Sequence, residues 1–201
     1  INKSEVYGLT TPLLTKADGS KMGKSADGAI WLNEDKLKAY NFWQFWRNTM
    51  DEDVVKFLKL FTELPLDECE RLGKLQGSEI NTAKQILATE VTTLAHGRDK
   101  AENAEETSKT VFADGSSAKG LPTEYFYESE LINGVTGAQL FTKSGLSSSG
   151  KDAKRLISDG GARIDGIVLN DTSKLFYTDD IINGLKLSAG KKRHALIKIK
   201  K

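Results

Sequence analysis

Residues 144–166 read SGLSSSGKDAKRLISDGGARIDG, and this stretch decides the fold predicted for the end of the chain. The Ser/Gly run at 147–150 predicts a loop and a helix N-cap, and the helix that follows stops at the glycine pair 160–161. The Asp-Gly pair at 165–166 then predicts the turn of a hairpin that covers residues 162–170. A helix followed by a hairpin predicts a small α/β unit.

The flanking segments extend this unit. Residues 124–131 alternate enough to predict a strand, and a short helix is expected over 136–145. Residues 181–187 and 195–199 predict two further strands, joined through the basic turn 190–193. The last third of the chain therefore reads as a mixed α/β module.

The middle of the chain, residues 34–112, carries apolar side chains at helical spacing and predicts a series of helices. Asp51 and Pro65 suit helix starts, and Gly97 suits the end of the longest helix. The aromatic run at 42–46 can be a platform for nucleobases or part of the core. Core packing is favoured, because aromatic side chains at helical spacing usually bury.

The charge of the chain is unevenly distributed. Residues 138–201 hold 13 Lys/Arg against 6 Asp and no Glu, which is +7, and the remainder holds 16 Lys/Arg against 22 Asp/Glu, which is −6. The small polar segment 113–123 separates the acidic and basic parts and is the predicted linker. A basic block on an acidic body suggests a polyanion partner for that block, and a merely solvated basic face is the weaker interpretation.

Composition excludes several classes of protein. No apolar run approaches the roughly 18–20 residues that span a bilayer, so an integral membrane protein is excluded and no membrane partner is expected. Cys69 is the single cysteine, which rules out an internal disulfide framework and fits a reducing, cytosolic compartment. The two histidines, His96 and His194, leave little room for a metal site, and none is predicted. Cys69 and His96 lie on helical patterns and are expected to be structural.

A basic helix start follows the loop at 147–150. Lys151, Lys154 and Arg155 fall near one face of the predicted helix, where free backbone N–H groups and the helix dipole favour phosphate. A P-loop is excluded, because Asp152 follows Lys151. The separate basic turn around residues 191–194 fits a phosphate-contacting hairpin better than a nuclear localisation signal.

A second motif, KMGKS, occupies residues 21–25. Lys21 and Lys24 lie three apart on a glycine-containing loop, and two such charges can grip a triphosphate and suit a pyrophosphate leaving group. Gly23 allows such a loop to close. By composition alone the motif is weak, since lysine-rich surface loops are common.

The order of the residues makes this motif more specific. With GLTTPLLTKADG before it and GAIWL after it, the motif resembles the KMSKS loop of class I aminoacyl-tRNA synthetases, most closely of bacterial-type tyrosyl-tRNA synthetases. Gly23 stands where that motif has its middle serine. The resemblance implies that Lys21 and Lys24 are catalytic through their contact with ATP, that Ser25 is a lesser ATP-binding partner, and that the full-length enzyme uses Mg²⁺.

The resemblance continues along the chain. Residues 41–49, 53–62 and 88–97 are similar to parts of the helical anticodon-binding domain of that family. Residues 144–166 resemble the RNA-binding fold first named for small-subunit ribosomal protein four, which grips tRNA in these enzymes. The RNA-binding residues implied are Lys151, Lys154, Arg155, Arg163, Lys191, Lys192 and Arg193.

These observations predict an α+β protein, with a helical anticodon-binding-like domain followed by a small ribosomal-protein-four-like α/β domain. The expected parts are the end of a catalytic domain (1–33), the helical domain (34–112), the linker (113–123) and the RNA-binding domain (124–201). The chain begins at Ile1 and lacks a HIGH-type sequence, so it is expected to be the C-terminal part of a longer enzyme.

The resemblance implies a cytoplasmic tyrosine–tRNA ligase that acts on tyrosine, ATP and tRNA-Tyr, and that dimerises through its missing catalytic domain. The chain alone is expected to be inactive. Two alternatives stay open at this point. One is a non-enzymatic protein that binds structured RNA, and the other is a helical interaction domain with an incidental basic face.

Overall fold

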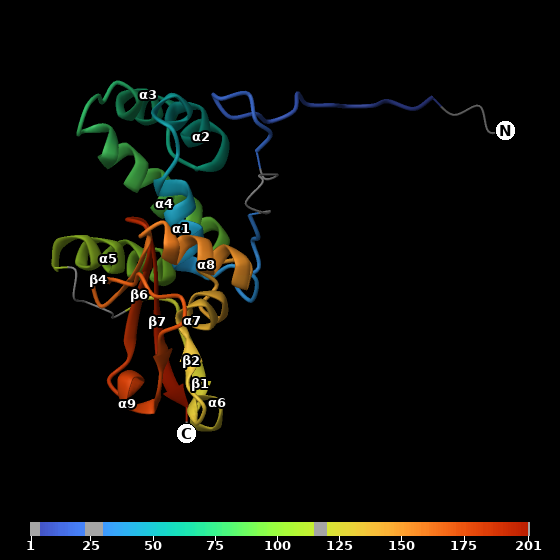
Figure 1. Ribbon diagram of the computed structural model, residues 1–201. Coiled ribbons are helices and arrows are strands. Elements are labelled where there is room, and N and C mark those ends of the chain that lie inside the picture. The colour runs from blue at the N-terminus through green and yellow to red at the C-terminus, as the bar shows by residue number, and fades with distance from the viewer. Residues whose placement is uncertain (1–4, 23–29, 115–119, 201) are drawn as a thin grey trace.

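The computed structural model describes residues 5–22, 30–114 and 120–200. A helical region comes first and a small sheet follows it, so the protein is a mixed α+β structure as predicted (Figure 1). In the described ranges, no helix is long and apolar enough to cross a bilayer.

Helices cover most of residues 39–114. They are α1 Ala39–Arg47, the 3-10 turn η1 Asp51–Asp53, α2 Val54–Phe61, α3 Leu66–Gly73, α4 Ile80–His96 and α5 Arg98–Asp114. Helix α1 packs against α4 and α5, and α2 packs against α3. The first helix begins at Ala39 and not near residue 34, because Asn33 organises a turn there: its Oδ1 accepts the Asp35 N–H at 2.9 Å.

The aromatic run at 42–46 lies mainly in the core. Phe42, Trp43 and Trp46 are buried, whereas Phe45 is half-buried at the edge of the cluster. The ring of Trp46 meets those of Phe57 and Phe61 at centroid distances of 5.9 and 5.0 Å. The prediction of core packing is thus confirmed for three of the four aromatic residues.

Five of the described strands form one sheet in the order β1-β7-β6-β3-β4. The strands are β1 Thr123–Tyr127, β3 Ala162–Ile164, β4 Ile167–Val168, β6 Leu185–Ala189 and β7 Arg193–Lys200. Strands β1 and β7 are parallel, and the other neighbours are antiparallel. A second, two-stranded pair joins β2 Val135–Thr136 to β5 Leu175–Phe176.

Short helices cover one face of this sheet. They are α6 Glu128–Leu131, α7 Gly137–Lys143, α8 Gly150–Ser158 and α9 Thr178–Ile181. The buried side chains of α7 and α8 share one apolar cluster with the inward-facing residues of β6 and β7. The predicted helix-then-hairpin pattern is confirmed: α8 precedes the β3–β4 hairpin, whose turn residues Asp165 and Gly166 have φ of 48° and 84°.

Two predicted strands are wrong in part. The strand expected over 124–131 ends at Tyr127, where the Glu130 carboxylate accepts the Tyr127 N–H at 2.8 Å and starts α6. The strand expected over 181–187 begins only at Leu185, because Asp180 accepts the Tyr177 N–H at 2.8 Å and starts α9. In both places a capping carboxylate outweighs strand propensity.

The two regions meet through a small apolar contact. Leu121 and Leu196 belong to the sheet region, yet both pack into the apolar cluster of the helical region. The predicted linker 113–123 overlaps regular structure at both ends, because α5 runs to Asp114 and β1 begins at Thr123.

Candidate functional site

A small hairpin over residues 14–22 carries the first lysine of the KMGKS motif. Thr15 and Lys21 form an antiparallel bridge, and the Gly19 N–H donates to the Lys16 carbonyl at 2.9 Å. Gly19 has φ of 80°, a conformation that glycine adopts without steric cost. The turn therefore presents Lys21 on the returning arm of the hairpin.

Of the predicted ATP-contacting residues, the structure describes Lys21, which is exposed to solvent. Lys24 and Ser25 lie outside the described residues. An exposed ammonium group is of a kind that can interact with the phosphates of a nucleotide through its charge.

The hairpin is bonded to the helical region. The buried Asp53 carboxylate, 2% exposed, accepts the Ala17 N–H at 2.9 Å. The Lys56 ammonium donates to the Thr15 carbonyl, and Met22 packs against the apolar cluster of the helices. The start of α2 thus holds the segment that carries the motif.

Helix α8 exposes the predicted cations. Lys151, Lys154 and Arg155 are all exposed, while Ala153 and Ile157 face the core. Amphipathic spacing places the three cations on the solvent side of the helix, as the sequence predicts. They form a basic face with no buried member.

The start of α8 already holds a negative charge of its own. The Ser149 Oγ accepts the Asp152 N–H at 3.2 Å, so one N–H of the helix start is occupied. Hydrogen bonds from the hydroxyls of Ser148 and Ser149 lower the pKa of Asp152, with smaller contributions from Arg155 and Lys151. A phosphate at the start of α8 would therefore have to be bound by the side-chain cations more than by the helix terminus.

The two predicted arginines of the sheet have structural partners. The Arg163 Nη1 donates to the Gly166 carbonyl in its own hairpin at 3.1 Å. The Arg193 Nη1 donates to the Leu146 carbonyl at 3.0 Å and so ties the start of β7 to the loop before α8. Each guanidinium keeps further donors, because a single bond uses one of its five N–H groups.

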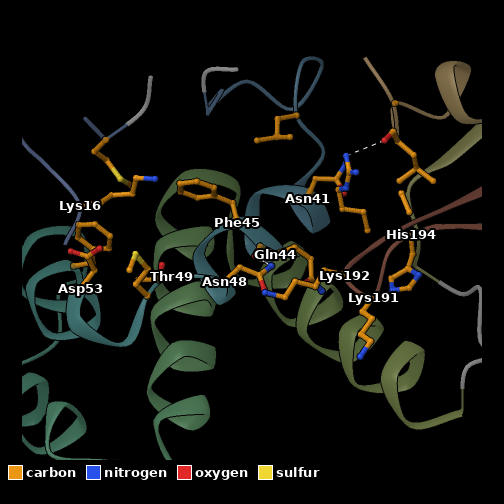
Figure 2. A pocket seen from close by; sticks show the side chains of 18 of the residues that line it. Lys16, Asn41, Gln44, Phe45, Asn48, Thr49, Asp53, Lys191, Lys192 and His194 are labelled. Atoms are coloured by element: carbon orange, nitrogen blue, oxygen red, sulfur yellow. Dashed lines mark hydrogen bonds between the residues drawn. The ribbon is translucent and has the colours of Figure 1, made fainter. Parts of the chain in front are cut away.

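Two adjoining hollows lie between α1 and the β6–β7 turn, and we call them together the α1 cleft. Their volumes are about 670 and 680 Å³. Gln44, Asn48, Lys191 and Lys192 line both hollows. Figure 2 shows the α1 amides in the middle of the first hollow, with the two lysines beside them. The cleft thus brings the predicted residues Lys191 and Lys192 to the helical region.

The second hollow of the α1 cleft is basic. Arg47, Lys84 and Lys109 line it from the helices, opposite Lys191 and Lys192. Lys84 pairs with Asp51, and Lys109 pairs with Glu105 at 2.6 Å, so part of this charge is balanced. Burial lowers the pKa of Arg47 from its ordinary value, although an arginine stays charged at neutral pH.

A buried network orients Gln44 in the cleft. Its Nε2 donates to Tyr40 Oη at 3.2 Å and to Ser108 Oγ at 3.1 Å. Burial raises the pKa of Tyr40 to about 12, so its hydroxyl stays protonated at neutral pH. The side chain of Gln44 is therefore held in place before any ligand binds.

Sequence reasoning missed the α1 side of this cleft. Asn41, Gln44 and Asn48 follow one another at helical spacing and line the first hollow together with Phe45, the half-buried aromatic residue of the run. The sequence signal for this side of the cleft is the stripe of amides within and beside the aromatic run. Amides can donate to and accept from the edges of nucleobases.

The chain belongs to the class I tRNA synthetases of the W and Y group, because the model of that family matches residues 1–113. It is 57% identical over 194 residues to a tyrosine–tRNA ligase of Dinoroseobacter shibae, covering 96% of this chain and 46% of the relative. It is 54% identical over 195 residues to a tyrosine–tRNA ligase of Roseobacter denitrificans, covering 97% and 47%.

Among solved structures, a C-terminally truncated mitochondrial tyrosyl-tRNA synthetase of Coccidioides posadasii is 35% identical, with a TM-score of 0.42 over 49% of this chain and 26% of that one. The chain spans about half the length of the curated relatives that it matches.

Proposed function

We propose that the chain is the part of a tyrosine–tRNA ligase that supplies an ATP-contacting loop and the grip on tRNA-Tyr. The identity to relatives named tyrosine–tRNA ligase along almost the whole chain carries this proposal. The parent enzyme activates tyrosine with ATP and transfers it to tRNA-Tyr, and it works in the cytoplasm as a homodimer built by its catalytic domain.

Each region has a role in this proposal. Residues 1–33 end the catalytic domain, residues 34–112 form the anticodon-binding domain, and residues 124–201 form a ribosomal-protein-four-like RNA-binding domain after the linker 113–123. The basic face of α8 and the lysines that line the α1 cleft support contacts with RNA phosphates, since cations that follow a groove neutralise a nucleic-acid backbone.

In the ATP loop, Lys21 and Lys24 contact the triphosphate, and Ser25 assists them. Their charge stabilises the negative charge that develops on pyrophosphate as it leaves. Mg²⁺ bound to ATP neutralises phosphate charge in such reactions. The described residues contain no group of three or more acidic, histidine or cysteine side chains suited to a metal.

The tRNA-binding part is tested by changing Lys151, Lys154 and Arg155 to alanine together in the 201-residue chain. We expect tRNA-Tyr affinity to fall at least tenfold at moderate salt, and the slope of log K against log salt to become shallower by about two to three. Filter binding at several salt concentrations measures both quantities. Lys174→Ala changes an exposed lysine of the same module outside the proposed site and serves as the control.

Competition with a structured RNA that lacks the tRNA-Tyr features separates this proposal from its rival. Preference for tRNA-Tyr supports the ligase assignment. Equal binding of both RNAs would favour a general structured-RNA-binding protein, and an unchanged affinity of the triple variant would leave the basic face incidental.

The ATP loop is tested in the full-length enzyme with Lys21→Ala. We expect kcat/KM for tyrosine-dependent ATP–pyrophosphate exchange to fall about 100-fold, the usual size of one electrostatic contact to a transition state. Lys16→Ala, on the same hairpin, is the matched control. The 201-residue chain by itself is expected to show no exchange.

A further inference from the structure

One face of the β1–β7 pair is open at the end of the sheet far from the α1 cleft. Tyr125 is paired with Lys198, and Tyr127 is paired with Lys200. Paired residues of neighbouring strands point to the same face, and residues two apart on a strand share that face. The four side chains therefore stand together, and we call them the β1–β7 face.

This face is exposed, whereas the other side of the same strands is core. Tyr125 and Tyr127 are 45% and 51% exposed, and both lysines are exposed. Phe126, which lies between the tyrosines, is buried in the apolar cluster beneath the sheet. Two large aromatic rings thus face solvent on the side of the strand that does not contribute to the core.

The helical region covers only the other end of this face. Leu196 lies two residues before Lys198 on the same side of β7 and packs into the helical cluster. The cover therefore stops before the tyrosines. Figure 1 shows the C-terminal end of β7 beside the short helix α6, at the end of the sheet that is far from the helical region.

The charges on the β1–β7 face favour an anionic partner. The Lys200 ammonium lies 5.8 Å from the centre of the Tyr127 ring, so aromatic and cationic groups are interleaved. Glu124 points to the opposite face, and the nearby Glu130 is bonded to Lys143 at 2.7 Å. Glu128 is an exposed carboxylate at the end of β1 and limits the face on that side.

We propose that the β1–β7 face binds unpaired RNA nucleotides, with Tyr125 and Tyr127 stacking on bases and Lys198 and Lys200 contacting phosphates. Aromatic rings on a sheet surface stack on bases of every sequence, and adjacent cations follow the backbone. The rings are two residues apart on one strand, roughly 7 Å, which leaves room for one base on each.

This surface is separate from the proposed tRNA grip. From Arg193 at the cleft to Lys200, seven residues of strand span about 23 Å. An oligonucleotide can therefore bind at one of the two places without contacting the other. The inference therefore goes beyond the proposed function and can hold even if tRNA-Tyr is not the natural partner.

The test uses the 201-residue chain and a fluorescein-labelled oligouridine of eight nucleotides, which has no stable structure. We expect Tyr125→Ala with Tyr127→Ala to weaken binding at least tenfold in fluorescence anisotropy, since each stacked base contributes strongly. Tyr125→Phe with Tyr127→Phe keeps both rings and should stay within about threefold of the wild type. Tyr177→Ala removes a tyrosine that is 46% exposed outside this face and serves as the matched control.

Further variants separate this surface from the basic face of α8. Lys198→Ala with Lys200→Ala should make the slope of log K against log salt for oligouridine binding shallower by about 1.4. This is the value expected when two phosphate contacts of a single strand are lost. The effect of the tyrosine-to-alanine pair should persist when Lys151, Lys154 and Arg155 are also changed.

Two results would overturn the proposal. Oligouridine binding of the tyrosine-to-alanine pair at wild-type strength would assign the face to another partner, such as a protein. An equal loss of oligouridine affinity in the phenylalanine pair would exclude stacking, because this pair retains both rings. This comparison does not depend on whether the alanine pair folds.

Discussion

At the scale of single residues, environment decides the role more than residue type does. His194 is 8% exposed, and its Nδ1 lies 2.9 Å from the Ser188 Oγ within the sheet. His96 meets the ring of Phe42 edge-on at a centroid distance of 4.9 Å. Burial is the main cause that lowers the pKa of each histidine, and Lys186 lowers that of His194 further. The fold therefore disfavours the charged form of both imidazoles.

This environment predicts a stability that depends on pH. The unfolded histidine has a pKa near 6.5, and the pKa of folded His194 is lower, so the unfolded state binds more protons between these values. The free energy of unfolding should hence fall as the pH drops below about 6.5, by at most about 1.4 kcal/mol per pH unit for this group.

Urea unfolding at pH 7.5 and 5.5 measures the effect. His194→Asn should reduce the difference between the two pH values, and His96→Asn gives a separate comparison for the second histidine. The same pH difference in His194→Asn as in the wild type would show that this histidine is not responsible.

At the scale of elements, local capping and one long-range bond set the boundaries. Helices α6 and α9 each begin where a carboxylate three residues further along the chain accepts a backbone N–H, a local pattern that the sequence carries. The hairpin over residues 14–22 is different. Its position depends on Asp53, 36 residues away from Ala17, and no local pattern predicts such a pair.

The hairpin yields a prediction at this scale. Asp53→Ala removes the acceptor of the Ala17 N–H, so we expect this amide to exchange with solvent at least tenfold faster in hydrogen-exchange measurements. The amides of the α4 core should keep their wild-type rates. Glu52→Ala, which changes the exposed carboxylate next in sequence, is the control. Unchanged exchange at Ala17 in Asp53→Ala would mean that the hairpin does not depend on this bond.

At the scale of the whole molecule, two apolar clusters fold beside each other and share a narrow contact. One lies among the helices and the other beneath the sheet. Leu196 connects them, because its strand belongs to the sheet while its side chain packs among the helices. The same arrangement creates the α1 cleft, since the β6–β7 turn is held opposite α1.

Leu196→Ala should loosen this connection. We expect the free energy of unfolding to fall by about 2–3 kcal/mol, because a buried leucine between the two clusters is truncated. In calorimetry, the unfolding steps of the two clusters should separate further. Leu187→Ala, inside the sheet cluster, should lower the sheet transition alone. A single sharp transition in Leu196→Ala would contradict this view of two clusters.

The sequence by itself determined that a helical region precedes a mixed α/β module, and it determined the burial of Trp43 and Trp46, the β3–β4 turn and the exposed cations of α8. These features depend on spacing, turn chemistry and amphipathic pattern within short windows, which the chain carries locally. The sequence did not predict α6, α9 or the β2–β5 pair. Lys24 and Ser25 lie outside the described residues, so their predicted role stays a prediction.

Only the tertiary structure decided which distant residues share a site. It brought Lys191 and Lys192 to the amides of α1, bonded the 14–22 hairpin to Asp53, and left Tyr125 and Tyr127 uncovered beside Lys198 and Lys200. The physical reason is that such neighbours follow from how the two apolar clusters pack and from the parallel β1–β7 pairing. Both join segments that are far apart in sequence, where local periodicity carries no information.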